Sequence, residues 1–225
     1  MNKTKTNKIW GERMKSKPSE LLTEINASID IDKELYQQDI DGSIAHCKML
    51  AKQKIIKSDI SKKIHKGLEK IRREIKSKKF KFSKNSEDIH LNIEKRLFEI
   101  IGPEAGFLHI ARSRNDQVTT DFKLWVISAS SDLNLEIKKL IKAIIKLADK
   151  HKDLIMPGFT HLKNAQPVLF SHYLLAYVEM FKRDYKKFIN VIKNTSENPL
   201  GSAALAGTSF TIDRFYTSKQ LGFLK

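Results

Sequence analysis

Apolar residues recur at spacings of three and four along most of the chain, which is the period of a helix with one buried face. The pattern predicts a helix that begins near Pro18, a second over about Asp32–Gln53, and a third that begins near Ser58. A fourth begins at a Ser86 cap and ends at Gly102-Pro103, because glycine and proline stop helices. The apolar faces of the last two helices are Ile60, Ile64, Leu68, Ile71 and Ile75, then Ile89, Ile93, Leu97 and Ile100.

Two longer helical patterns follow in the second half of the chain. No glycine or proline interrupts Val118 to Met156, and about 35 to 40 helical residues at ~1.5 Å each would span more than ~50 Å. A helix of that length needs packing partners along it. Another long pattern runs from Leu169 to Ile192.

The organisation changes near Gly102 to His109, because the helical patterns before this point are short and those after it are long. We expect a flexible arm over residues 1–17, a small helical domain over 18–108 and a long-helix domain over 109–225. The 225 residues include only 9 glycines and 5 prolines, and 40% are hydrophobic, which allows a core. The predicted fold class is therefore all-α.

The net charge of +16, from 42 Lys and Arg against 26 Asp and Glu, would suit nucleic acid or an acidic membrane as a partner. The lysines are scattered, however, and mostly fall on the polar sides of the helical patterns. We interpret them as solvated helix faces, and expect neither a nucleic-acid nor a membrane partner. The same positive field would steer a small anionic substrate.

Cysteine content and the start of the chain bear on the compartment. Cys47 is the only cysteine, which excludes an internal disulfide or a cysteine-rich zinc site and fits a reducing cytoplasm. The basic start, MNKTKTNKIWGERMK, lacks the apolar core of a secretory signal, and no run of about 18 apolar residues occurs. We therefore expect a cytoplasmic protein.

Three polar segments carry more hydrogen-bonding side chains than a connection between helices requires. The first, HIARSRNDQ, spans residues 109–117 and places two arginines beside Ser113, Asn115 and Asp116. Arginine binds carboxylates in a planar fork, so the segment suits a carboxylate-binding cluster. A helix cap with an internal Arg–Asp pair explains the same residues equally well.

The second segment, MPGFTHLKNAQP over residues 156–167, separates the two long helical patterns. His161 could act as a general acid or base, since an unperturbed histidine has a pKa near ~6.5. Thr160 beside it could hold a substrate oxygen. A histidine in a connection is more often structural, but Asn164 and Gln166 lie within five residues and favour a functional site.

The third segment, PLGSAALAGT, spans residues 199–208. Its small residues allow close backbone approach and expose amide N–H groups, although a tight packing turn would use the same residues. It lacks the spacing of a phosphate-binding loop, and the chain has no HExxH pair or Cys/His cluster. We expect no metal site.

The three segments, in this order and at these separations, resemble argininosuccinate lyase, a family of the fumarase/aspartase superfamily. WGERM near the start, NASIDID at Asn26–Asp32 and EDIHLNIEKRL at Glu87–Leu97 extend the resemblance from Ile9 to Phe223. It implies a small N-terminal helical domain followed by very long helices, which four subunits pool into one central bundle. It also implies the last step of arginine biosynthesis, in which argininosuccinate is eliminated to arginine and fumarate without a metal or organic cofactor.

The resemblance assigns roles to individual positions. His161 matches the family's catalytic histidine, which takes part in proton transfer, and Thr160 matches its substrate-binding neighbour. The other matches are Ser28, Arg114 and Asn115 as substrate-binding residues, with Ser113 and His90 as further candidates.

Departures inside the motifs are small: Ile110 replaces a usual threonine, Lys163 a glutamine and Ala203 a glycine. Length is the large departure, because family members are roughly twice as long. These residues include no later loop of the form GSSxMPxKKNP, which supplies a serine base, and no acidic partner for the histidine. We therefore expect the incomplete bundle to be inactive alone, and the complete protein to be a homotetramer or to use a second polypeptide for the rest.

Two alternatives stay open. A lyase of the same superfamily could act on another succinyl-amine substrate such as adenylosuccinate, although the combination of EDIH, SRNDQ and THL argues against this. The chain could also be a non-catalytic helical fragment or a decayed copy, including one that binds nucleic acid through its positive charge.

Overall fold

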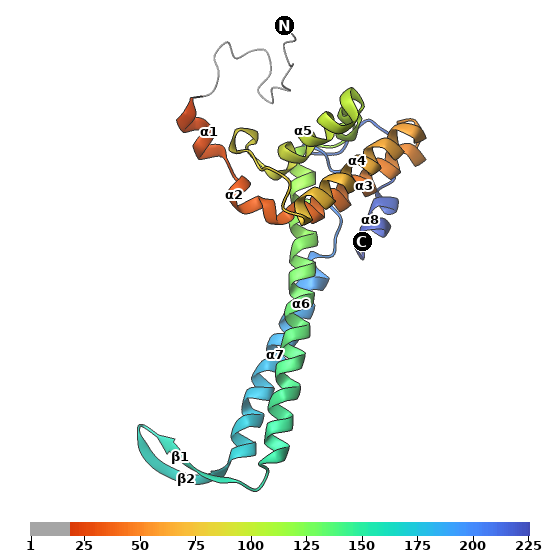
Figure 1. Cartoon of the computed structure of the whole chain (residues 1–225). Coiled ribbons are helices and arrows are strands. Elements are labelled where there is room, and N and C mark those ends of the chain that lie inside the picture. The colour runs from red at the N-terminus through yellow and green to blue at the C-terminus, as the bar shows by residue number, and fades with distance from the viewer. Residues whose placement is uncertain (1–18) are drawn as a thin grey trace.

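The computed structural model describes residues 19–225, so the arm expected over residues 1–17 and the start near Pro18 lie outside the described part. Figure 1 shows a helical head and a long two-helix stalk that ends in a β-hairpin. The head and stalk correspond to the short and long helical patterns of the sequence.

The head contains most of the short helices. They are α1 (Glu20–Asn26), α2 (Ile29–Asp32), the 3-10 helix η1 (Lys33–Leu35), α3 (Tyr36–Lys52), α4 (Ser58–Lys76), η2 (Lys84–Ser86), α5 (Ile89–Ile101) and η3 (Gly102–His109). The helix expected over Asp32–Gln53 is therefore divided, with a 3-10 turn before α3.

The expected Ser86 cap is wrong. Ser86 ends η2, and Glu87 has a φ of 57°, so helical geometry cannot begin until after it. The cap is Asp88, whose side chain accepts the Leu91 N–H at 2.6 Å. Both serine and aspartate can cap a helix, and the backbone turn at Glu87 selects between them.

The core of the head lies between α3, α4 and α5, where most of the expected apolar positions are buried and Ile60, Ile75 and Ile100 pack half-buried against it. Its central members are Ile40, Leu50, Ile64, Leu68, Ile71, Ile89, Ile93 and Leu97. Gly67 lets α4 approach α5, because a Cβ at this position would lie 2.5 Å from Leu97 Cδ1.

The stalk consists of α6 (Arg114–Lys150, 37 residues) and α7 (Phe170–Thr195, 26 residues), which run side by side (Figure 1). The long helix was expected over Val118–Met156. It begins earlier because a cap at Ser113 starts it, and it ends at Lys150 because the chain turns into a strand. Val178 is the one buried residue of α7, so the stalk has almost no core of its own.

The second polar segment forms a hairpin, which the sequence analysis did not predict. Strand β1 (Ile155–Thr160) pairs antiparallel with β2 (Lys163–Leu169), with a bulge near Gly158. A Cβ on Gly158 would lie 2.6 Å from the Gln166 carbonyl oxygen, so glycine is required there. The strands were missed because most of their residues are exposed and show no alternating apolar pattern.

After α7 the chain returns to the head through the third polar segment and ends with α8 (Arg214–Leu221), which packs against α3. Leu200 and Phe223 are buried in this return. None of the helices described combines the length and the apolarity needed to cross a membrane. The division at residues 108 and 109 stays a prediction.

Candidate functional site

The candidate residues lie at two opposite ends of α6. Thr160 and His161 lie at the hairpin tip, and the other candidates lie in the head. The 37 residues of α6 at ~1.5 Å each separate the two groups by roughly 55 Å. A single chain therefore cannot bring all its candidate residues into one site.

The start of α6 is built by a capping box. The Ser113 hydroxyl accepts the Asn115 N–H at 3.2 Å, and Asp116 Oδ1 accepts the Ser113 N–H at 2.9 Å. This pair satisfies amides that a helix start would otherwise leave without partners. The helix-cap interpretation of the first polar segment is thus confirmed, but Asp116 accepts from backbone groups, and no arginine within residues 19–225 pairs with it.

Arg114 is already paired with carboxylates of its own chain. Its Nη1 and Nη2 lie 3.1 and 3.3 Å from the two Glu94 oxygens, and its Nε lies 3.3 Å from Asp88 Oδ2. Burial opposes ionisation of Glu94, yet His109 and Arg114 lower the pKa of its carboxyl. The Arg114 side chain is 27% exposed, so a substrate carboxylate could reach it only in competition with Glu94.

Asn115 and Asp116 connect the first polar segment to the third. The Asn115 side-chain amide donates to the Ala204 carbonyl at 3.1 Å. Asp116 Oδ2 accepts the N–H groups of Gly201 and Ala203 at 3.0 and 2.8 Å. The small residues of the third segment therefore do present backbone amides, and these amides bind an internal carboxylate.

Ser28 belongs to the same region of the head. Its hydroxyl donates to Asp32 Oδ2 at 2.6 Å, and Asp32 Oδ1 accepts the Ile89 N–H at 3.1 Å. Burial raises the pKa of the Asp32 carboxyl, with the Ser28 hydrogen bond acting in the opposite direction. Because Asp88 adjoins Ile89 and contacts Arg114, these hydrogen bonds link Ser28 to the start of α6.

His90 is buried, contrary to its expected place at an open site. Its Nδ1 lies 2.8 Å from Asp39 Oδ1 and 3.4 Å from Asp121 Oδ2, and Gln117 Nε2 donates to Asp39 Oδ1 at 2.5 Å. The ring is 1% exposed. His90 therefore joins α3, α5 and α6 and does not face a substrate in this chain.

Asp39, His90 and Asp121 have ligand-type atoms that all lie within 4.8 Å of one another, so they are the described residues that could hold a cation. Burial and the neighbouring Asp39 raise the pKa of the Asp121 carboxyl well above its usual range. Burial also acts to raise the pKa of the Asp39 carboxyl, but contact with His90 holds that pKa well below its usual range. The charge of Arg112 acts to lower the pKa of both carboxyls, and the hydrogen bonds of Asp39 with His90 and Gln117 favour an internal network over a metal site.

The hairpin tip presents Thr160 and His161 to solvent. His161 and Leu162 form a two-residue turn with φ values of 47° and 62°, as in a type I′ turn. Leu162 is 99% exposed, and His161 beside it is exposed as well. The tip is thus free to contact another molecule.

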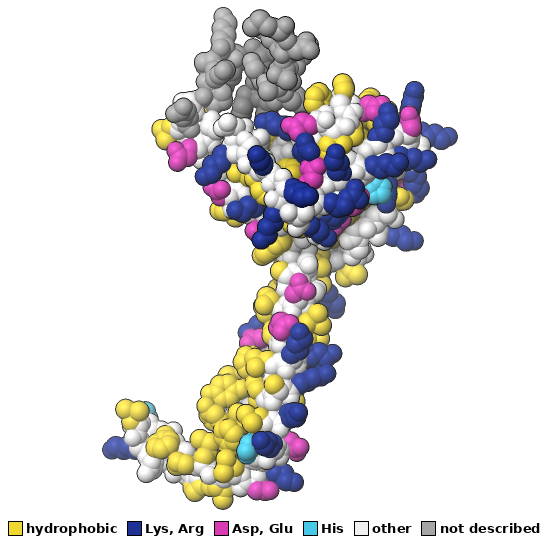
Figure 2. Space-filling model, viewed as in Figure 1, with side chains coloured by type: hydrophobic (Ala, Val, Ile, Leu, Met, Phe, Trp, Pro, Cys, Tyr) yellow, Lys and Arg dark blue, Asp and Glu magenta, His cyan; other side chains and the backbone are white. Residues whose placement is uncertain are grey.

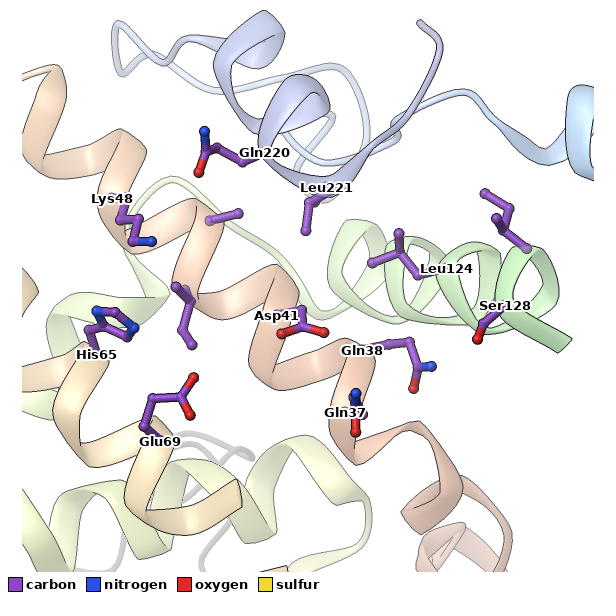
Figure 3. A pocket seen from close by; sticks show the side chains of 13 residues that line it. Gln37, Gln38, Asp41, Lys48, His65, Glu69, Leu124, Ser128, Gln220 and Leu221 are labelled. Atoms are coloured by element: carbon purple, nitrogen blue, oxygen red, sulfur yellow. The ribbon is translucent and has the colours of Figure 1, made fainter. Parts of the chain in front are cut away.

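Figure 3 shows a cavity of about 530 Å³ between α3, α4, α6 and α8. Its polar lining includes Asp41, Lys48, His65 and Glu69, and none of the candidate residues contributes to it. We base the candidate site on the start of α6 because the directional polar groups gather there.

Sequence reasoning missed the positions that hold the candidates in place. The Ser113–Asp116 spacing matches the pattern of a capping box, so Asp116 could have been found from that signal. Glu94 and Asp88 carried no such signal, because only packing of α5 against α6 brings them to Arg114.

Comparisons with known proteins point to one family. A family model described as lyase matches residues 12–225. The chain is 58% identical over 224 residues to an argininosuccinate lyase of Pelagibacter ubique, covering 99% of this chain and 48% of the relative. Identity to an argininosuccinate lyase of Bartonella bacilliformis is 54% over 219 residues, covering 97% and 47%. The chain spans about half the length of the curated relatives it matches.

Solved structures agree with this result. An EDDS lyase variant with bound fumarate superposes with a TM-score of 0.77 at 27% identity, covering 90% of this chain and 39% of that chain. The structure titled fumarate lyase:delta crystallin from Brucella melitensis gives 0.72 at 15% identity, covering 88% and 48%, which shows a shared fold. The expected helical fold is confirmed, and, with the family model matching nearly its whole length, the chain belongs to the lyase family.

Proposed function

We propose that this chain contributes to an argininosuccinate lyase, a carbon–nitrogen lyase that releases fumarate and arginine from argininosuccinate. The observation that carries the proposal is the 58% identity to the Pelagibacter ubique relative over 99% of the chain. The segments that hold the candidate side chains lie inside this match. The single cysteine, Cys47, is buried and free, in keeping with a reducing cytoplasm as the place of the reaction.

The proposed reaction is an elimination. A base removes a proton from the carbon next to a carboxylate, and the C–N bond then breaks with its electron pair on the nitrogen. That nitrogen takes up a proton to become part of arginine, and the carbon skeleton leaves as fumarate. His161 serves in proton transfer, since imidazole exchanges a proton near neutral pH.

Negative charge builds up on the carboxylate during this reaction, and fixed donors stabilise it. Thr160 on the hairpin and Asn115, Ser113 and Ser28 on the head are the proposed substrate-binding side chains. Arg114 contributes its guanidinium once the substrate carboxylate replaces Glu94 as its partner. The proposed chemistry needs no metal or organic cofactor, because it consists of proton transfer and charge stabilisation.

The separation of roughly 55 Å along α6 supports assembly of the site from several subunits. His161 of one copy would then meet the head of another copy. Figure 2 shows hydrophobic side chains gathered along the stalk, as a shared helix bundle requires. We propose a homotetramer for the complete protein, formed with the remaining half either on the same polypeptide or on a second one.

The proposal is tested by complementation. The chain over residues 1–225 is purified alone. It is also purified together with the half of the Pelagibacter ubique relative that lies outside the match, which gives the combined protein. We expect no fumarate from the chain alone and steady release of fumarate from argininosuccinate by the combined protein.

His161→Asn in the combined protein is the matched variant, and we expect a loss of about 10²- to 10⁴-fold because a general acid or base is removed. Adenylosuccinate is assayed in parallel. A combined protein that copurifies but releases fumarate from neither substrate contradicts the proposal, and preference for adenylosuccinate supports the alternative substrate. Turnover by the chain alone contradicts the expected dependence on the second half.

A further inference from the structure

We propose that Asp116 is a positioning residue of the site, which holds Asn115 in place through the segment Gly201–Ala204. The inference rests on the proposed function, because it concerns a substrate-binding side chain of that reaction. Asp116 itself is 3% exposed and does not reach the surface where a substrate would bind.

Both carboxylate oxygens of Asp116 are in use. Oδ1 accepts the Ser113 N–H at 2.9 Å, and Oδ2 accepts the N–H groups of Gly201 and Ala203 at 3.0 and 2.8 Å. The two contacts of Oδ2 cross 85 and 87 residues of sequence. Asp116 therefore joins the start of α6 to a distant segment, in addition to capping its own helix.

The segment Gly201–Ala204, which Asp116 contacts, has little freedom to move. Gly201 has a φ of 105°, and a Cβ there would lie 2.8 Å from both Ile212 Cδ1 and Arg214 Cγ. Ala203 also has a positive φ, of 53°, a backbone conformation that is unfavourable for an alanine. Two hydrogen bonds to a buried carboxylate offset this cost and hold the strained backbone against α6.

Asn115 depends on this arrangement. Its side-chain Nδ2 donates to the Ala204 carbonyl at 3.1 Å, which sets the direction of the exposed amide. Ala204 follows Ala203 directly, so the hydrogen bond from the Ala203 N–H to Asp116 also fixes the position of the Ala204 carbonyl. Loss of that contact would free the segment and, with it, the Asn115 side chain.

The experiment compares Asp116→Asn with Asp213→Asn. Asparagine at 116 can still accept from Ser113, but its NH₂ group would face two N–H donors. Asp213 is the matched control because it caps α8, accepting the Tyr216 N–H at 2.9 Å, and its other hydrogen bond is to Lys52 and not to Gly201–Ala204. Both variants lose one charge at a helix start.

Hydrogen exchange is measured first, on the 225-residue chain. We expect Asp116→Asn to accelerate exchange of the Gly201 and Ala203 amides, with Asp213→Asn leaving these amides as they were. Unchanged exchange in Asp116→Asn overturns the proposal. This measurement is independent of catalysis.

Kinetics follow on the combined protein of the complementation test. We expect Asp116→Asn to lower kcat/KM about hundredfold, as misplacement of a substrate contact does. In a background that carries Asn115→Ala, we expect Asp116→Asn to have little further effect, because two residues that act through one contact are not additive.

The outcomes separate the two hypotheses. Full additivity of Asn115→Ala and Asp116→Asn would mean that Asp116 is only structural, and so would kcat/KM losses that are equal in Asp116→Asn and Asp213→Asn. Either result overturns the inference while the unsubstituted protein stays active. An inactive unsubstituted protein instead shows that the proposed function has failed.

Discussion

Several polar side chains of the head are buried with few partners, and His46 is the one with the clearest consequence. The ring is 1% exposed, and its Nε2 lies 2.8 Å from the Ile110 carbonyl oxygen. A carbonyl can only accept, so Nε2 carries the proton and Nδ1 is unprotonated. Burial, with Arg112 nearby, lowers the pKa of His46 to about 3.

This shift predicts a pH dependence of stability. Between pH ~6.5 and about 3 the unfolded chain binds a proton at His46 that the folded chain does not. The free energy of unfolding therefore falls as pH falls through this window, with His46 contributing up to about 1.4 kcal/mol per pH unit. In His46→Gln we expect a correspondingly shallower slope in urea unfolding curves measured across these pH values.

His172→Gln is the control for this prediction. His172 is exposed on α7, so its replacement removes no buried neutral ring, and the slope should change less than in His46→Gln. Equal slopes for His46→Gln and the unsubstituted chain would show that His46 is not the buried neutral group that its surroundings indicate.

At the scale of elements, the contact between α4 and α5 depends on a glycine inside a helix. Glycine is normally unfavourable there by about 1 kcal/mol relative to alanine, so Gly67→Ala would stabilise an isolated α4. In the head, the added methyl would lie 2.5 Å from Leu97 Cδ1 and 3.3 Å from Ile101 Cγ2. Helix propensity therefore favours the substitution Gly67→Ala, whereas core packing opposes it.

We expect packing to prevail. Overpacking a close-packed core costs about 1 to 3 kcal/mol, which exceeds the gain in helix propensity. Gly67→Ala should therefore lower the free energy of unfolding, measured by urea denaturation. Gly106→Ala is the comparison, because a Cβ at Gly106 meets no atom within 4 Å. A Gly67→Ala protein as stable as the original would mean that α5 can move away at no cost.

The sequence predicted the length of the stalk helix α6 well, but it predicted the ends of this helix poorly. The absence of glycine and proline correctly predicted a helix long enough to span more than ~50 Å. Its first residues belong to the first polar segment, whose arginine, asparagine and aspartate side chains suit a carboxylate-binding cluster and a helix cap equally well. The capping box resolves this, because it makes the same polar residues part of a helix start.

At the scale of the whole molecule, the stalk exposes too much apolar surface for an isolated helix pair. The exposed apolar residues include Leu133, Leu135, Leu140, Ile145, Leu147, Leu175, Tyr177 and Met180. Such a stripe marks an interface, because burial of apolar area is the main driving force of association. Figure 2 shows hydrophobic side chains along the stalk between the head and the hairpin.

This surface predicts self-association of the chain. Leu133→Lys combined with Leu140→Lys places two charges in the stripe, and we expect the molar mass measured by light scattering to shift towards that of the monomer. Asp132→Asn combined with Asp149→Asn raises the net charge by the same two units at exposed positions of α6, without altering the apolar stripe, and should leave the mass unchanged. A monomeric unsubstituted chain at every concentration would contradict the prediction.

The sequence names the candidate residues, whose roles stay a prediction, but it does not indicate how they are arranged. Motif resemblance named Ser28, Arg114 and His161, and the family match agrees with that resemblance. Their partners follow from tertiary contacts: Glu94 occupies Arg114, and Asp32 accepts from Ser28. His90 shows the limit, since a motif histidine can be buried between two aspartates as well as exposed to substrate.

The sequence by itself determined where the helices lie and which faces they bury, because helix formation and apolar periodicity depend on residues three and four apart. It also determined the family through the order and spacing of three polar segments. Only the tertiary structure decided that the first and third segments join at Asp116 and that the second lies at the opposite end of α6 as a hairpin. The physical reason is that these contacts connect residues far apart in the chain, whose meeting depends on how α6 and α7 direct the backbone.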